Sequence, residues 1–203
     1  MHNNPNLGQK EIKKYKLFEA YCRLCSHQNW QVRKSCCSLL PTISSKTPSQ
    51  VKKKDIVSIY NSFLSDESVE VQIEAKCIIG PLVHSYYPDS EVPAVMLDYI
   101  IDLCPSPLGT LRHPAVVLER LAYCFPAIVL AFGKDNWSKL NTPFQRMVKL
   151  PNLEITKPIA YGMHEIARII SPSSCTIDLY PIILEMLRGP KELKLGILSN
   201  LHI

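Results

Sequence analysis

Apolar residues recur along this chain in a pattern that repeats about every 39 residues. From Val32 onward, apolar side chains follow four, eight and eleven positions later, which is the spacing of one stripe along an α-helix. The pattern starts again at intervals of 39, 46, 38 and 38 residues, at Val71, Val117, Ile155 and Leu193, and the last copy is shortened. A recurrence of this length is typical of helical-repeat proteins. The pattern therefore predicts one amphipathic helix in each of five repeats.

A second amphipathic segment precedes each of these helices at a matching distance. In the first repeat its apolar positions are Leu17, Phe18, Tyr21, Leu24 and Cys25, and in the second they are Ile56, Val57, Tyr60, Phe63 and Leu64. The sequence thus predicts five helical hairpins, at about 10–44, 51–87, 92–132, 136–171 and 175–203. A hairpin cannot bury both of its apolar stripes alone, so we expect the hairpins to stack on one another. The predicted fold is all-α, an α-α superhelix in which residues 1–203 form a single array.

The positions of the prolines agree with the predicted boundaries of the hairpins. Pro93, Pro114 and Pro181 stand near predicted helix starts, where the missing N–H costs little. Four others lie inside the second helices of the hairpins, where we expect kinks: Pro41, Pro81, Pro126 and Pro158. The turn at 105–114 in the third hairpin is about six residues longer than its counterparts. It is either a tolerated surface loop or an extension of a binding edge.

Composition narrows the classes of protein that fit this pattern. Only seven of the 203 residues are glycine, which argues against a β-rich fold and against phosphate-cradling loops. The longest apolar stretch, 122–132, is far shorter than the ~20 residues that span a bilayer, so no membrane partner is expected. No secretory signal follows the first residues, and eight cysteines without one indicate reduced thiols. We expect a protein of the cytosol, and also of the nucleus.

The net charge of +5 includes two groups of lysines, which are Lys10, Lys13, Lys14 and Lys16, then Lys52, Lys53 and Lys54. Such groups favour an acidic partner. Neither group has the interleaved aromatic residues of a nucleic-acid platform. We therefore interpret both as solvated helix starts.

The segment YCRLCSHQNWQVRKSCC, residues 21–37, raises the question of a metal or redox site. Cys25 and Cys36 occupy repeat positions that the other hairpins fill with apolar side chains, and a free thiol packs as a small apolar group. Cys36 and Cys37 are adjacent on a helix and diverge by ~100°, which suits a common metal poorly. Packing is therefore the preferred interpretation, and Asn29 is expected to cap the following helix.

Sequence motifs for catalysis are missing. The chain has no GxSxG elbow, Walker loop, HExxH pair or calcium loop. Carboxylates, bases and nucleophiles do not converge at any point of the predicted hairpins. We expect a protein that is not an enzyme, with no catalytic residue, no cofactor and no metal ligand.

Two segments carry a resemblance to a known family. Residues 17–86, beginning LFEAYCRLCSHQNWQVRKSCC, and residues 178–203, DLYPIILEMLRGPKELKLGILSNLHI, resemble HEAT repeats of protein phosphatase 4 regulatory subunits of the regulatory subunit 1 type. These are related to the scaffold subunit of type 2A phosphatases. The resemblance implies a non-catalytic scaffold that binds a serine/threonine protein phosphatase catalytic subunit and directs it to phosphoprotein substrates.

The resemblance also implies where a partner would bind. In such scaffolds the turns between paired helices, along one ridge, contact the partner. Carried onto this chain, the protein-binding positions are Trp30, Arg33, Lys34, Asp66 and Glu67. The arginine that follows the repeat anchor occurs only once, because its equivalents are Gln72, Leu118, Thr156 and Lys194. An acid-to-arginine ladder between neighbouring hairpins is therefore incomplete.

Two other classes remain open. One is a different HEAT-repeat adaptor, such as a nuclear-transport type receptor, and the other is a nucleic-acid-binding protein that uses the lysines. The last predicted helix adds a further expectation, because nothing follows to cover its apolar stripe of Leu193, Ile197, Leu198, Leu201 and Ile203. Solenoids normally end in a polar capping repeat. We expect the chain to be a fragment of a longer array, or a partner to cover this face.

Overall fold

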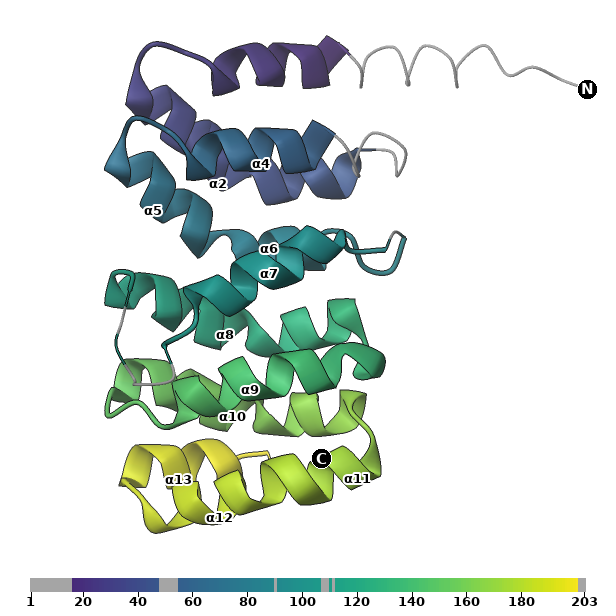
Figure 1. Cartoon of the computed structure of the whole chain (residues 1–203), viewed down its shortest axis with the longest axis vertical. Helices are drawn as coiled ribbons and strands as arrows, with labels where there is room; N and C mark the ends of the chain where they lie inside the picture. The colour runs from purple at the N-terminus through teal and green to yellow at the C-terminus, as the bar shows by residue number, and fades with distance from the viewer. Residues whose placement is uncertain (1–15, 48–54, 90, 107–109, 111, 201–203) are drawn as a thin grey trace, which may run out of the picture. The chain divides into compact units, whose positions relative to one another are not determined.

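The computed structural model describes residues 16–47, 55–89, 91–106, 110 and 112–200 and contains no strand within them (Figure 1). It confirms the prediction of an all-α fold made of helical hairpins. The chain divides into two compact parts, Met1–Ile78, here called unit 1, and Ile79–Ile203, called unit 2. Some predictions fall outside the described residues: those on the lysines at 10, 13, 14 and 52–54, on part of the 105–114 turn, and on Leu201 and Ile203.

Unit 1 consists of two hairpins. The first pairs a helix at 16–25 with α2 (Trp30–Lys46), and the second pairs α4 (Val57–Leu64) with α5 (Val69–Cys77). Helix α2 packs against both α4 and α5. The core of the unit is formed by the residues that the repeat pattern places inward, including Tyr21, Cys36, Leu40, Tyr60, Phe63 and Val71. The anchor Val32 is only half-buried.

Each hairpin of unit 1 is closed by the same buried hydrogen bond. The Tyr21 hydroxyl donates to the carbonyl of Cys36 at 2.7 Å, and the Tyr60 hydroxyl donates to the carbonyl of Ala75 at 3.1 Å. In both cases the two residues are 15 apart in sequence. Tyr60 follows Tyr21 by 39 residues, and Ala75 follows Cys36 by 39. The recurrence of one bond at one period confirms the repeat alignment of these two hairpins.

Removing either hydroxyl should cost a similar amount. We expect Tyr21→Phe and Tyr60→Phe each to lower the free energy of unfolding by about 0.5–1.5 kcal/mol, because each leaves the ring in place and removes one buried hydrogen bond. Urea unfolding of the full chain measures this. Tyr123→Phe is the control, since Tyr123 is 75% exposed. Equal stability of all three variants and the wild type would contradict a structural role for the two bonds.

Unit 2 holds the remaining helices. Those of the second-helix type are α6 (Ile79–His84), α8 (Ala115–Phe132), α10 (Leu153–Ile169) and α13 (Lys191–Leu198). Those of the first-helix type are α7 (Ala94–Leu103), α9 (Trp137–Val148) and α12 (Tyr180–Arg188). Short turns of helix, η2 (Lys134–Asn136), α11 (Pro172–Ser174) and η3 (Cys175–Leu179), precede α9 and α12. Trp137 is buried, and its indole N–H donates to Asp178 at 2.8 Å, which joins α9 to η3.

Helix α8 lies at the centre of unit 2. It packs against α6 on one side and α10 on the other, and α10 in turn packs against α13. By length and composition alone, α8 is apolar enough to cross a membrane. In the fold, however, Val117, Leu121, Phe125 and Ile128 of this helix are fully or almost fully buried. These four residues belong to the core of the unit, while 39% of the helix as a whole is buried.

Small residues set the spacing between these second helices. An added Cβ at Gly162 of α10 would lie 2.6 Å from the Cγ of Pro126 of α8. At Gly196 of α13 it would lie 2.9 Å from the Cβ of Ala160 of α10, and at Gly80 of α6 it would overlap the Cβ of Cys124. Real Cβ atoms do not approach other atoms so closely. Each of these three contacts thus requires the hydrogen of a glycine.

The prolines inside the second helices of the hairpins differ in their effect on the helix. Helices α2, α8 and α10 continue through Pro41, Pro126 and Pro158. Around Pro81, by contrast, α5 ends at Cys77 and α6 begins at Ile79. Proline has no N–H to donate to the carbonyl four residues earlier, here that of Cys77, and its ring crowds that carbonyl. Near the helix starts, Pro93 and Pro114 are the N-cap residues of α7 and α8, as their positions predicted.

The prediction for the last helix was wrong for two residues of its apolar stripe. Leu193 and Ile197 are only 9% and 5% exposed, because α13 turns that stripe toward α10 and α12. Leu198 of the predicted stripe is 53% exposed, and further exposed apolar residues lie on η3 and α12, at Ile177, Tyr180 and Leu184. In the first hairpin Leu17 and Leu24 were expected in the core and are exposed. The notion of a longer array stays a prediction.

Candidate protein-binding edge

The two turns of unit 1 have well-defined local structure. Asn29 is the N-cap of α2, as predicted, and its side-chain oxygen accepts the N–H of Gln31 at 2.8 Å. Its own N–H donates to His27 Nδ1 at 3.0 Å. In the second turn, a carboxylate oxygen of Asp66 accepts the N–H of Ser68 at 2.8 Å, just before α5. These bonds satisfy backbone donors that a helix start leaves open.

Arg33 joins the two turns. Its Nε and Nη2 donate to the two carboxylate oxygens of Asp66 at 2.7 and 2.8 Å, a bidentate pair. Its Nη1 donates to the carbonyls of His27 and Gln28 at 2.8 and 2.9 Å. The Arg33 and Asp66 side chains are 14% and 7% exposed. The guanidinium therefore clamps the first turn to the second.

The electrostatics agree with this geometry. The hydrogen bonds from Arg33 hold the pKa of the Asp66 carboxyl below its ordinary value, and burial opposes them only in part. Bonding to Asp66 likewise raises the pKa of the Arg33 guanidinium. Both groups are therefore charged throughout the neutral range.

Weaker polar contacts also join α2 to α5, beside the Arg33–Asp66 pair. Lys34 lies 3.4 Å from Glu70 in an exposed ion pair, and the Ser38 hydroxyl donates to Glu74 at 2.6 Å. Gln72, which stands where the next arginine of a ladder would be, donates instead to the carbonyl of Asp66 at 2.7 Å. The two hairpins of unit 1 are thus joined by one strong ion pair and a row of polar contacts.

The structure separates the five predicted binding residues into two groups. Arg33 and Asp66 bind each other, and the four hydrogen bonds of the guanidinium all go to unit 1. Trp30 is 40% exposed, Lys34 is half-buried and Glu67 is exposed. That these residues contact a partner stays a prediction. The geometry makes Arg33 and Asp66 positioning residues for the exposed ones.

Sequence reasoning missed one residue of this edge. Val69 is the first residue of α5 and is 64% exposed, as Trp30 is the first of α2. The two are 39 residues apart, so they occupy the same repeat position. The shared repeat position is the sequence signal that could have identified Val69 as an edge residue. An isolated valine at a helix start is, however, more readily interpreted as a core residue. We call Trp30, Lys34, Glu67 and Val69, with the clamp beneath them, the turn edge.

The cysteines of the first hairpin are packing residues, as predicted. Cys25, Cys36 and Cys37 are buried, and Cys22 is half-buried. Burial raises the pKa of the Cys25 thiol to about 12, and it also raises the pKa of Cys37. Among the described residues, no group of three or more histidine, cysteine or acidic side chains is placed to hold a metal ion.

These thiols should be slow to react. At pH 8 a thiol with a pKa of about 12 is ionised in only about one molecule in ten thousand, and the thiolate is the reactive form. We expect N-ethylmaleimide to leave Cys25, Cys37 and Cys104 of the folded chain unmodified and to label all three once the chain is unfolded in urea. Mass spectrometry of peptides after timed pulses measures this. Rapid labelling of Cys37 in the folded chain would contradict its burial.

The stacked hairpins and their recurring tyrosine bonds place the chain in the class of all-α helical-repeat proteins. The crystal structure of an engineered protein has a similar fold, with a TM-score of 0.59 and 17% identity over 98% of this chain and 83% of that one. No protein-family model matches the chain.

Named proteins with similar sequences define the class of this chain more closely. The chain is similar to human serine/threonine-protein phosphatase 4 regulatory subunit 1, with 27% identity over 127 residues, which is 58% of this chain and 13% of the human protein. The mouse and rat proteins of the same name are 27% identical over 112 residues, 55% of this chain and 12% of theirs. The chain thus corresponds to a small part of the length of these relatives.

Proposed function

We propose that this chain is part of a non-catalytic regulatory scaffold that binds a serine/threonine phosphatase catalytic subunit of the phosphatase 4 type. The similarity to regulatory subunit 1 of phosphatase 4 supports the class of partner. The turn edge of unit 1 supplies the surface. In the complete protein, such a scaffold would direct the phosphatase to its phosphoprotein substrates.

The observation that carries this proposal is the clamp of Arg33 on Asp66. A surface binds tightly when its contact residues are held in place before the partner arrives, because less conformational entropy is then lost. The clamp fixes the two turns with two charge-assisted bonds to Asp66 and two more to turn carbonyls. Trp30 and Val69 are left exposed at equivalent positions. A partly exposed tryptophan among polar neighbours is a common anchor of protein interfaces.

A pull-down with the full chain from cell extract tests the proposal. We expect it to recover a phosphatase catalytic subunit, detected by mass spectrometry and by phosphatase activity on the beads. Trp30→Ala should weaken recovery about tenfold or more, since a central aromatic anchor contributes about 2 kcal/mol. Adding Glu67→Lys to the Trp30→Ala chain should weaken the recovery of phosphatase further. Tyr123→Ala is the matched control, because it removes an exposed aromatic ring from unit 2.

The outcomes separate the parts of the proposal. Recovery of phosphatase that is unchanged by Trp30→Ala and Glu67→Lys would show that the turn edge is the wrong surface. No phosphatase with the wild-type chain, and recovery of a small GTPase or of transport cargo, would favour the adaptor alternative. Circular dichroism of each variant confirms that the helices are intact.

A further inference from the structure

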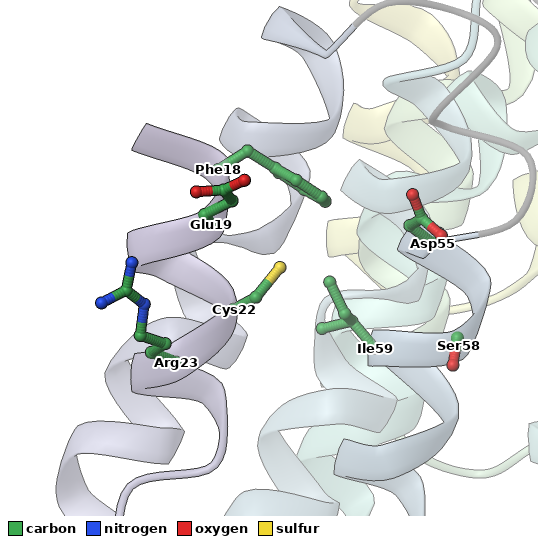
Figure 2. A pocket seen from close by; sticks show the side chains of 7 residues that line it. All are labelled: Phe18, Glu19, Cys22, Arg23, Asp55, Ser58 and Ile59. Carbon is green, nitrogen blue, oxygen red and sulfur yellow. The ribbon is translucent and has the colours of Figure 1, made fainter. Parts of the chain in front are cut away.

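Unit 1 has a second surface feature, away from the turn edge. A groove of about 590 Å³ lies between the helix at 16–25 and the start of the second hairpin (Figure 2). Its lining residues are Phe18, Glu19, Cys22, Arg23, Asp55, Ser58 and Ile59. None of them belongs to the residues that we assign to the turn edge. The groove is broad and open, so it suits a segment of chain better than a small enclosed molecule.

The floor of the groove is apolar. Figure 2 shows Phe18 and Cys22 on one helix and Ile59 on the other, with their side chains pointing into the gap between the helices. All three are half-buried. Their remaining exposed surface faces a space that an apolar side chain could occupy. Filling it would remove apolar surface from water on both partners.

The two sides of the groove each carry a carboxylate. Glu19 stands on the helix at 16–25 and Asp55 at the start of the second hairpin, and both are exposed. The guanidinium of Arg23 points away from the gap in Figure 2. Two of the three charged residues that line the groove are therefore acidic, although the whole chain carries a net charge of +5.

The Cys22 thiol responds to this negative charge. Its pKa is raised, first by burial and then by the charges of Asp55 and Glu19. Cys22 thus lies within reach of both carboxylates. Its thiol is also a natural site for chemical labelling within the groove.

We propose that this groove binds a basic amphipathic segment of a partner protein. One apolar side chain of the segment would insert between Phe18, Cys22 and Ile59. Lysine or arginine residues on either side of it would pair with Glu19 and Asp55. Nucleic acid and anionic lipid surfaces are disfavoured as occupants, since Glu19 and Asp55 would lie close to their phosphates.

Binding of a defined peptide tests this. The ligand is a synthetic amphipathic helical peptide of leucine and lysine, and its matched control has glutamate at every lysine position. We expect the full chain to bind the lysine peptide in a fluorescence anisotropy titration and to bind the glutamate peptide at least tenfold more weakly. The double variant Glu19→Lys/Asp55→Lys should weaken the lysine peptide at least tenfold. The double variant Glu154→Lys/Glu192→Lys makes the same charge change at two exposed sites of unit 2 and should leave the affinity within twofold.

The wild-type chain gives a second measurement that needs no variant. Bound lysine peptide should slow the alkylation of Cys22 by N-ethylmaleimide several-fold and leave the rate at Cys175, half-buried in unit 2, unchanged. The proposal is overturned if the lysine peptide does not bind, if the double variant binds it equally well, or if Cys22 is not protected. Trp30→Ala should not affect this binding, so a failure here and a failure at the turn edge can be told apart.

Discussion

Replacing Gly162 with alanine should destabilise unit 2 by about 1–3 kcal/mol, although alanine is the better helix former by ~1 kcal/mol. The added methyl group would lie 2.6 Å from the Cγ of Pro126. A flexible side chain could turn aside, but the proline ring is bonded at both ends to the backbone of α8. The two helices must therefore move apart, and the contacts between α8 and α10 are the most extensive in unit 2. The steric cost exceeds the gain in helix propensity.

A double-mutant cycle isolates this contact. Pro126→Ala removes Cγ and Cδ and leaves only the Cβ, which lies 4.0 Å from the position of the new methyl group, an ordinary van der Waals distance. In that background Gly162→Ala should be neutral or stabilising. Guanidinium unfolding, followed by the fluorescence of buried Trp137 in a Trp30→Phe chain, measures unit 2. Equal destabilisation in both backgrounds would show that contact with Pro126 is not the cause.

Removing the Asp66 carboxylate should have the largest effect in unit 1. We expect Asp66→Asn to lower the free energy of unfolding by about 2–4 kcal/mol, because Arg33 would keep its charge in a largely buried site without its partner. Glu70→Gln is the matched control. It alters the exposed pair with Lys34 and should cost about 0.5 kcal/mol or less. Urea unfolding at neutral pH and constant salt compares the two.

The same residue makes a prediction about pH. Because the folded-state pKa of Asp66 is lower than its ordinary value, its ionisation stabilises the folded chain. This contribution is complete at neutral pH and is lost as pH falls below about 4, the ordinary pKa of an aspartate, and through the folded-state value. The stability difference between the wild type and Asp66→Asn should therefore shrink in acid. A difference that grows as pH falls would contradict the lowered pKa.

Much of the fold could be predicted from the sequence, because helical periodicity and the repeat period acted together. Tyr21 and Tyr60 were placed inward by spacing alone, and both are buried. The errors concern residues whose neighbours the pattern cannot identify. Leu17 and Leu24 have helical spacing but are exposed, and Leu193 and Ile197, for which the sequence predicts no cover, are buried. An apolar stripe in a sequence does not say which helix it faces.

The candidate site was predictable only in part. Its positions and the idea of an acid-to-arginine ladder followed from a resemblance, but only the structure shows the bidentate geometry and the burial of the Arg33–Asp66 pair. Without the structure, Arg33 looked like a contact for a partner, whereas its donors are used within unit 1. Likewise, the sequence does not indicate which proline a glycine such as Gly162 will contact in the folded chain. Contacts between helices depend on the rotation of each helix about its axis, and spacing alone fixes that rotation too loosely.

The tyrosine hydroxyls restrict how the connections of this protein can vary in length. Residues added between the two helices would have to loop out of the turn for the tyrosine hydroxyl to keep its bond to the carbonyl fifteen positions downstream. The third hairpin has Ile100 and Leu121 at these places, 21 positions apart, and neither side chain has a hydroxyl group. The longer connection is thus found in a hairpin that lacks this bond. An affinity tag placed inside the chain belongs in that third connection, and the first two should be left at their natural lengths.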